Sequence, residues 1–373
     1  MMLRSHSINT QNNPDRNKRK QADDAIKNPS EPVPKKQNST GLTVLRTSIS
    51  GLKIETGTKI YLKTDADKEN IEYLLREDIQ FSVDPTDPCP HYDFDKEEAG
   101  NLESVSEFAN EIFKYYKSRE KHFRIQDYLP KHPDIDEKTR AILVDFLVET
   151  QETFELNHET LYNAVKIIDM YLAKTRNVRK CKIQIAACAA VFLASKYDER
   201  SPPLVDDLVY MAGDEFSREE FLAMERELFS QIDFDLGSPL SYRYLRRLAR
   251  VSRTSMVSLT LARYILESSL LIYDYALLSG ARMAAAAFLL AMKMTDINYQ
   301  WNPILEKYSG FTSEDILPLM EHLNHKMHFL NKEWNRLANI RNKYSHEVFF
   351  CVATTPLLPD SDPKLDLRSI SYP

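Results

Sequence analysis

The sequence predicts an all-α protein in which two copies of one five-helix unit follow a disordered N-terminal tail. Three observations predict this fold. From Val105 onward, apolar residues recur three and four positions apart with almost no strand-like alternation. Two segments of the first half recur in the second half at nearly one offset. Residues 1–60 are rich in Asn, Ser, Thr, Lys and Pro, a composition that buries too little apolar area to offset the entropy of ordering.

The region before the first unit divides into a tail and an acidic linker. Residues 65–105 are acidic, and the three prolines of "DPTDPCP" interrupt regular structure there. We therefore assign residues 1–104 to a disordered regulatory tail and acidic linker. The rest of the chain is assigned to a first unit with its leading helix (105–237), a second unit (238–345) and a C-terminal tail (346–373).

The first unit is expected to open with a leading amphipathic helix and to continue with five helices. The leading stripe consists of Phe108, Ile112 and Tyr115. The five helices are expected, in chain order, at Ile142–Phe154, at Leu161–Leu172 after the N-cap Asn157, in the alanine-rich stretch 181–197, after Pro203, and from the capping box of Ser217 and Glu220 to Ile232.

The second unit repeats the first. "FSREEFL" at residues 216–222 recurs as "FTSEDIL" at 311–317, and "ACAAVFLASK" at 187–196 recurs as "AAAAFLLAMK" at 284–293. Because both matches keep the same helix type in the same order, residues 140–236 and 240–335 are expected to be two copies of one unit with an alanine-rich central helix.

Composition argues against several function classes. The chain has eight glycines, and none falls into the glycine-rich patterns that bring a backbone close to a phosphate, which disfavours nucleotide-binding enzymes. The net charge of −6 disfavours general nucleic-acid binding. The four cysteines lack zinc-ligand spacing, and no apolar run is long enough to span a bilayer. We expect no direct nucleic-acid or membrane partner and a protein of the nucleus or cytoplasm.

Four charged residues of the first unit lie beside apolar helix faces: Arg140, Asp169, Lys196 and Glu225. A buried carboxylate is costly alone and much less so beside a guanidinium that offers a bidentate fork, which makes Arg140 a candidate partner of Asp169. The alternative is that each charge is solvated at a helix edge.

Several stretches together resemble the cyclin box: "RAILVDFL", "NAVKIIDMYL", "LASKYDERSPP" and "FLAMERELFSQIDFDL". The resemblance is closest to mitotic B-type cyclins of the third subtype, and it covers about residues 105–345. It implies two tandem five-helix cyclin folds. It also implies a monomeric cyclin that forms a heterodimer with a mitotic cyclin-dependent kinase, activates it and controls progression through mitosis or meiosis. It also implies no enzymatic activity of its own, no cofactor and no metal.

The resemblance assigns roles to individual residues. Arg140 and Asp169 would form an internal ion pair between the first two helices. The surface for the kinase would comprise Lys196, Glu225, Tyr197, Phe229, Leu236 and the leading-helix residues Phe108, Ile112 and Tyr115. By the repeat offsets Lys196 corresponds to Lys293 and Glu225 to Met320, so we expect only the first unit to bind the kinase.

A second implied surface is a groove that docks short basic and hydrophobic motifs of kinase substrates. Thr139 and Phe146 stand where methionine and tryptophan are usual in the family, and the alternative role of this stripe is core packing. The implied groove residues are Thr139, Ile142, Leu143, Phe146, Glu149, Ile183 and Gln184.

B-type cyclins also have a basic pocket for phosphorylated partners. Arg246 and Arg263 match two of its positions, whereas Leu259 replaces a histidine at the third. Arg246 belongs to a group of arginines that share one helix face by their spacing. The alternative role of this face is that of a solvated surface. That face consists of Arg243, Arg246, Arg247 and Arg250.

The tail carries candidate signals for destruction and transport. Lys68, Glu69 and Asn70 form a KEN box, and Arg46 to Ile54 resembles a destruction box with Ile49 in place of leucine. In this family such signals imply degradation through the anaphase-promoting ubiquitin ligase. A split basic cluster is a candidate nuclear-import signal, formed by Arg16, Lys18, Arg19, Lys20, Lys35 and Lys36.

Two other functions compete with this interpretation. A transcription-factor or pocket-protein relative would use the same doubled helical fold as a DNA-binding or peptide-binding platform, which the acidic balance disfavours. A helical metalloenzyme would depend on His322, His325 and His328, but these spread over about 120° of a helix without an evident fourth ligand.

Overall fold

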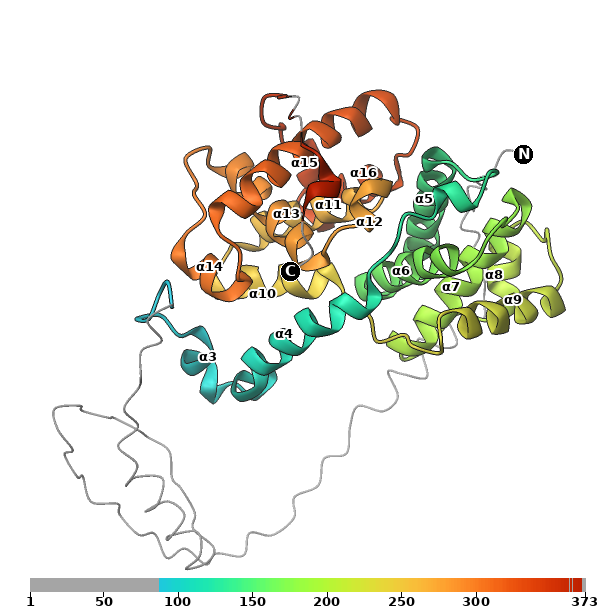
Figure 1. Cartoon of the computed structure of the whole chain (residues 1–373), viewed down its shortest axis with the longest axis horizontal. Helices are drawn as coiled ribbons and strands as arrows, with labels where there is room; N and C mark the ends of the chain where they lie inside the picture. The colour runs from blue at the N-terminus through green and yellow to red at the C-terminus, as the bar shows by residue number, and fades with distance from the viewer. Residues whose placement is uncertain (1–86, 362, 364, 371–373) are drawn as a thin grey trace, which may run out of the picture. The chain divides into compact units, whose positions relative to one another are not determined.

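The computed structural model of this chain describes residues 87–361, 363 and 365–370. The KEN box, the stretch from Arg46 to Ile54 and the basic clusters of the tail lie outside the described residues. The described chain is helical, and the two predicted units follow one another in it (Figure 1).

The first unit contains the five predicted helices. The capping box expected at its last helix is present, since Ser217 Oγ accepts from the Glu220 N–H at 3.2 Å and the Glu220 carboxylate accepts from the Ser217 N–H at 2.8 Å. The helices are α5 (Glu137–Thr153), α6 (His158–Lys174), α7 (Ile183–Asp198), α8 (Val205–Met211) and α9 (Arg218–Gln231).

The second unit repeats this order with one short insertion, α12 (Tyr273–Ala276). Lys293 and Met320, the counterparts of Lys196 and Glu225, lie on its third and fifth helices, and Met320 is buried. The five equivalent helices are α10 (Ser241–Val251), α11 (Met256–Ser269), α13 (Gly280–Thr295), α14 (Pro303–Ser309) and α15 (Ser313–Glu333).

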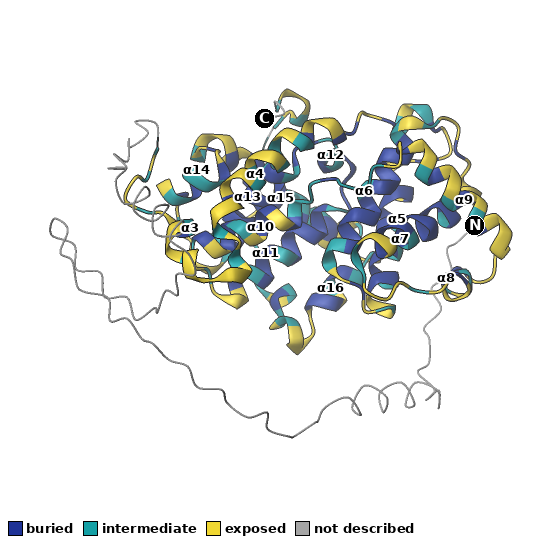
Figure 2. Cartoon of the chain, turned by 90° about the horizontal axis from the view of Figure 1, so that it is seen from below, coloured by how far each residue is buried: buried dark blue, intermediate teal, exposed yellow. Residues whose placement is uncertain are grey.

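The alanine-rich helices α7 and α13 are the centres of the two units. Each is buried around most of its circumference, because small side chains let neighbouring helices approach closely. α7 packs against α6 and α9, and α13 packs against α10, α11 and α15. Figure 2 shows buried residues on these inner helices and exposed residues on the outer ones. In the described residues no helix is long and apolar enough to cross a membrane.

Residues 93–104 form a docked segment where the sequence predicted a linker. They fold into α3 (Phe94–Glu97) and the 3-10 helices Glu98–Gly100 and Leu102–Ser104, and they lead directly into the predicted leading helix α4 (Ser106–Glu120). Three carboxylates of this segment pair with arginines of the second unit. We call residues 93–104 the acidic strap. The prolines that suggested a linker lie upstream of it.

The segment after the second unit is also packed rather than extended as a tail. Asn324 of α15 donates to the carbonyls of Leu358 and Pro359 at 3.2 Å, and the His328 ring bonds the Leu358 carbonyl at 2.8 Å. Before this segment, α16 (Asn339–Tyr344) packs against α5 and α11. The predicted tail therefore begins with residues that cover the second unit.

A buried polar network joins the two units. Glu267 of α11 accepts from Lys343 Nζ at 2.6 Å and from the Tyr344 hydroxyl at 2.9 Å. Lys343 also donates to Gln151 of α5 at 2.7 Å, and His158 of α6 lies 3.3 Å from Glu267. Although burial alone would raise it, Lys343 and His158 lower the pKa of Glu267 to about 2. The carboxylate is thus held ionised between the units.

Candidate functional site

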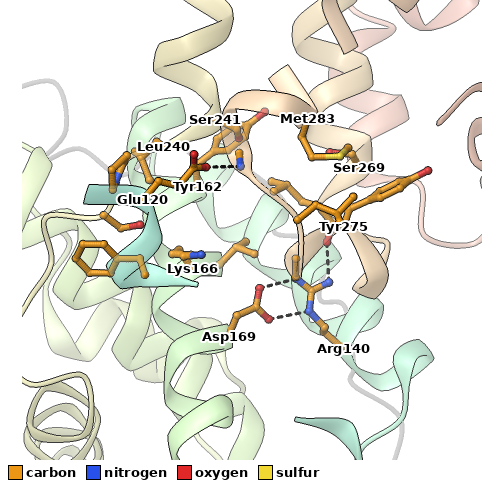
Figure 3. A pocket seen from close by; sticks show the side chains of 18 residues that line it. Glu120, Arg140, Tyr162, Lys166, Asp169, Leu240, Ser241, Ser269, Tyr275 and Met283 are labelled. Carbon is orange, nitrogen blue, oxygen red and sulfur yellow. Dashed lines mark hydrogen bonds and ion pairs between the residues drawn. The ribbon is translucent and has the colours of Figure 1, made fainter. Parts of the chain in front are cut away.

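The structure brings Arg140 and Asp169 together in a bidentate ion pair (Figure 3). Arg140 Nε and Nη2 donate to the two carboxylate oxygens at 2.8 and 2.7 Å, and both side chains are almost completely buried. Burial alone would lower the pKa of the Arg140 guanidinium, but the charge and hydrogen bonds of Asp169 raise it above its usual range. The pair links α5 to α6 inside the first unit.

The same pair also reaches the second unit. Arg140 Nη1 donates to the Leu270 carbonyl at 2.8 Å, and the Tyr128 hydroxyl donates to Asp169 at 2.7 Å. The backbone N–H of Tyr128 in turn donates to the Tyr273 hydroxyl oxygen at 2.8 Å. The sequence suggested only a link between two neighbouring helices, whereas the ion pair occupies the junction of the two units.

Lys196 and Glu225 form an ion pair at the surface of the first unit. Lys196 lies in the last turn of α7 and Glu225 lies on α9. The Lys196 side chain is 42% exposed and the Glu225 side chain 13%, and the ammonium lies 4.3 Å from the centre of the Phe192 ring. The ion pair is therefore partly accessible to solvent, and each group orients the other.

Several accessible apolar side chains lie on the same two helices as this ion pair or just after them. Tyr197 is exposed, and its hydroxyl lies beside Gly237, next to Leu236. Phe229 is half-buried and packs edge-on against Phe234, with ring centres 5.0 Å apart. Phe234 is largely exposed and was missed by the sequence analysis. The area combines fixed charges with accessible aromatic surface, the composition of a protein-binding site.

The leading helix presents the three residues expected on its outer face. Phe108 and Tyr115 are more than half exposed, and Ile112 is half-buried. The end of α4 is fixed by Glu120, which accepts from the N–H groups of Gly280 and Ala281 at the start of α13. Glu120, Arg140 and Asp169 all line one small cavity of about 90 Å³. Figure 3 shows their side chains around it.

The approach of Glu120 to α13 leaves little room for a side chain at position 280. A Cβ atom there would lie 3.0 Å from the Glu120 carboxylate and 3.3 Å from Ser241 Cβ. Ser279 Oγ adds a third hydrogen bond to the carboxylate at 3.0 Å. A negative charge is favourable at the N-terminus of a helix, so Glu120 caps α13 from a different part of the chain.

Comparison with known proteins identifies the family. A model of the cyclin N-terminal domain matches residues 111–237, and a model of the cyclin C-terminal domain matches residues 239–358. A "G2/mitotic-specific cyclin-B3" of Caenorhabditis elegans is 57% identical over 389 aligned residues, which cover 100% of both chains. The chain belongs to the cyclin family.

More distant relatives place this cyclin in the same branch. The cyclin-B3 of Gallus gallus is 46% identical over 71% of this chain and 65% of its own length. The cyclin-B3 of Drosophila melanogaster is 42% identical over 82% of this chain and 54% of its own length. These similarities confirm the resemblance to B-type cyclins of the third subtype. As a member of this family, the cyclin is a regulatory subunit of protein kinases and not an enzyme.

Three of the seven residues expected to form the substrate-docking surface are buried. Thr139, Leu143 and Ile183 are buried, so they pack the core of the first unit and cannot line a groove. Thr139 in addition bonds the N-cap residue Asp136 through its N–H at 2.7 Å. The half-buried members of the predicted patch are Ile142, Phe146, Glu149 and Gln184.

The predicted arginine face is divided among several partners. Arg246 and Arg263 both lie over the Tyr242 ring, at 5.9 and 5.3 Å from its centre, and Arg246 also pairs with Glu159 at 3.2 Å. Arg247 and Arg250 bond the acidic strap. The two residues of the proposed phosphate pocket are thus brought together by Tyr242, with Leu259 half-buried on the same helix as Arg263.

The three histidines of α15 have separate partners. His322 bonds the Tyr275 hydroxyl at 2.8 Å, His325 pairs with Asp360 at 2.9 Å, and His328 bonds the Leu358 carbonyl. Across the described part of the chain, no group of three or more His, Cys, Asp or Glu side chains is arranged to hold a metal ion. The histidines connect α15 to α12 and to the C-terminal segment.

Proposed function

We propose that this cyclin binds a mitotic cyclin-dependent kinase through the Lys196–Glu225 area and activates it. The observation that carries the proposal is an accessible ion pair in the first unit, with exposed aromatic residues on or just after the same helices, and the absence of an equivalent pair in the second unit. There Lys293 has no acidic counterpart, because Met320 occupies the equivalent position and is buried. The first unit alone therefore offers two fixed charges to a kinase helix.

Activation would follow from a shift between two kinase conformations. Phosphoryl transfer requires a lysine–glutamate pair inside the kinase, which forms when its regulatory helix swings inward. A rigid surface that binds the inward position more tightly stabilises it, and a change from mostly inactive to mostly active needs a difference of roughly 5.5 kcal/mol. Tyr197, Phe229 and Phe234 would supply apolar area, while Lys196 and Glu225 would set the register.

The proposal is tested with the double variant Lys196→Ala, Glu225→Ala and the matched control Lys293→Ala. We expect the double variant to lose most kinase binding and stimulation, and Lys293→Ala to retain both. Binding is measured by co-purification and titration, and stimulation by phosphorylation of a substrate peptide. If the double variant binds and stimulates the kinase fully, the proposed surface is wrong.

Three further parts of the function are proposed. The KEN box at Lys68, Glu69 and Asn70 would direct degradation through the anaphase-promoting ubiquitin ligase at the end of mitosis or meiosis. The basic tail clusters would direct the protein to the nucleus. The half-buried patch around Ile142 and Phe146 would dock substrates, with Glu149 available for their basic residues.

A further inference from the structure

The acidic strap is bound to a row of three arginines on the second unit. Arg247 donates to both carboxylate oxygens of Asp95 at 2.6 and 2.5 Å. Arg250 donates to Ser104 Oγ at 2.7 Å and to Glu98 at 3.3 Å. Arg253, just beyond α10, pairs with Glu97. We call Arg247, Arg250 and Arg253 the arginine row. Arg247 and Arg253 contact α3, and Arg250 contacts the two 3-10 helices, so the row bonds all three elements of the strap.

The contact made by Arg247 is buried, and both the strap and α4 pack against its guanidinium. Arg247 is largely buried, and its guanidinium carbon lies 5.8 Å from the ring centre of Phe94 in the strap and 5.2 Å from that of Phe113 in α4. The Tyr308 ring of α14 lies at 4.9 Å. The Phe94 N–H donates to the Tyr308 hydroxyl at 2.7 Å. An arginine stacked between rings and bound to a carboxylate is a specific, directional anchor.

The first two turns of α4, residues 106–112, bury one side chain, that of Ala109. The residue before the helix, Val105, has a φ of +46°, and its side chain provides no cap. Within α4 the buried residues are Ala109 and, eleven residues later, Glu120. The strap ends at Ser104, directly before Val105, and Arg250 bonds that serine. The position of the start of α4 therefore depends on the strap.

We propose that the arginine row is a binding surface for the chain's own acidic strap, and that the bound strap positions Phe108 and Ile112 for the kinase. Figure 1 shows the strap helix α3 beside α14 and continuous with α4, which runs from there toward the first unit. Arg247 is then a positioning residue, because it acts on the kinase through α4. This inference rests on the proposed function and adds a part of the second unit to it.

The test measures amide hydrogen exchange and kinase affinity on the full chain. In Asp95→Asn and Arg247→Gln we expect exchange in residues 93–112 to accelerate, and the kinase dissociation constant to rise, each by roughly tenfold or more. Glu97→Arg should act similarly, and Glu97→Arg with Arg253→Glu should restore both values. Because the Arg250–Glu98 and Arg253–Glu97 pairs are exposed, 1 M salt should also accelerate amide exchange in the wild-type strap.

Controls separate positioning from folding. Arg243→Gln removes an exposed arginine of the same helix whose charge acts on Asp198, and it should change neither quantity. Asp95→Asn keeps an oxygen that can accept from Arg247, so both units should stay folded, which the circular dichroism spectrum and a cooperative melting transition check. If the wild type binds the kinase and all strap variants bind equally well, this inference is overturned alone. If the wild type does not bind the kinase, the proposed function and the positioning role are both overturned.

Discussion

Arg140 and Asp169 share two hydrogen bonds at the junction of the two cyclin folds, where neither side chain has appreciable contact with solvent. Reversal of one charge would leave two carboxylates buried side by side. We expect Arg140→Glu to lower the free energy of unfolding by roughly 3–5 kcal/mol. The variant Arg140→Glu, Asp169→Arg should recover part of this loss. Urea denaturation measures both, and an unchanged stability of the single variant would contradict the assigned role.

The cap provided by Glu120 predicts a graded pair of variants. Glu120→Ala removes the acceptor of the Gly280 and Ala281 N–H groups and of the Ser279 hydroxyl. We expect a loss of about 1–3 kcal/mol, since these donors would be left buried and unsatisfied. Glu120→Gln keeps an oxygen in place and should cost less. Equal losses in the two variants, measured by thermal denaturation, would show that the hydrogen bonds are unimportant.

Glu267 predicts a specific loss of stability in acid. Its pKa is lowered from 4.5 to about 2 in the folded chain, where Lys343 and His158 outweigh the opposite effect of burial. A carboxyl group with a lowered folded pKa stabilises the fold above its unfolded pKa, and this contribution disappears as pH falls from about 4.5 toward 2. We expect Glu267→Gln to be less stable than wild type by on the order of 3 kcal/mol at pH 7. The difference between the two proteins should narrow below pH 4.5, as followed by urea denaturation at each pH.

Two apolar residues of α5, both assigned to the predicted docking surface, should differ in the effect of substitution on stability and on substrate binding. Leu143 is fully buried, so Leu143→Ala should cost roughly 2–5 kcal/mol of stability. Phe146 is half-buried. Phe146→Ala should instead raise the KM of the cyclin–kinase complex for substrates that carry a basic and hydrophobic docking motif. The same substrates without the motif are the control. An equal KM for the two substrates in the wild-type complex would exclude docking at this patch.

The KEN box predicts a change in protein lifetime. Alanine at Lys68, Glu69 and Asn70 should lengthen the half-life as cells leave mitosis, measured by a chase after synthesis is blocked. The adjacent triple variant Thr64→Ala, Asp65→Ala, Asp67→Ala is the matched control. If the first variant decays like wild type, degradation depends on another signal, such as the stretch from Arg46 to Ile54.

Local sequence was sufficient for the helices and their duplication, because helical periodicity and the recurrence of two segments depend on neighbouring residues. It was insufficient for contacts made across long separations. The pairing of Asp95 with Arg247 joins residues that no periodicity relates, although the opposite charges of "DFDKEE" and "RRLARVSR" were visible. Leu143 was assigned to the groove by the resemblance to related cyclins, and helical periodicity alone could not decide which apolar residues of α5 face the core.

Phe234 was missed for a different physical reason. It follows the end of α9, and both Asp233 and Phe234 have positive φ, so helical spacing does not predict the direction of its side chain. The backbone turn places its ring against Phe229. Exposed aromatic residues just after a helix are therefore worth examining when a binding surface is predicted from sequence.

The acidic strap determines where a folded fragment of this protein should begin. The cyclin N-terminal domain, as matched, begins at residue 111, which is inside α4 and after the strap. A fragment that begins at residue 111 would lack Phe94 and Asp95. The Tyr308 ring would lose its contact with Phe94, and Arg247 would lose its ion pair with Asp95. The smallest fragment suited to expression and crystallisation therefore begins before Tyr92, whose hydroxyl donates to the Val251 carbonyl at 2.7 Å.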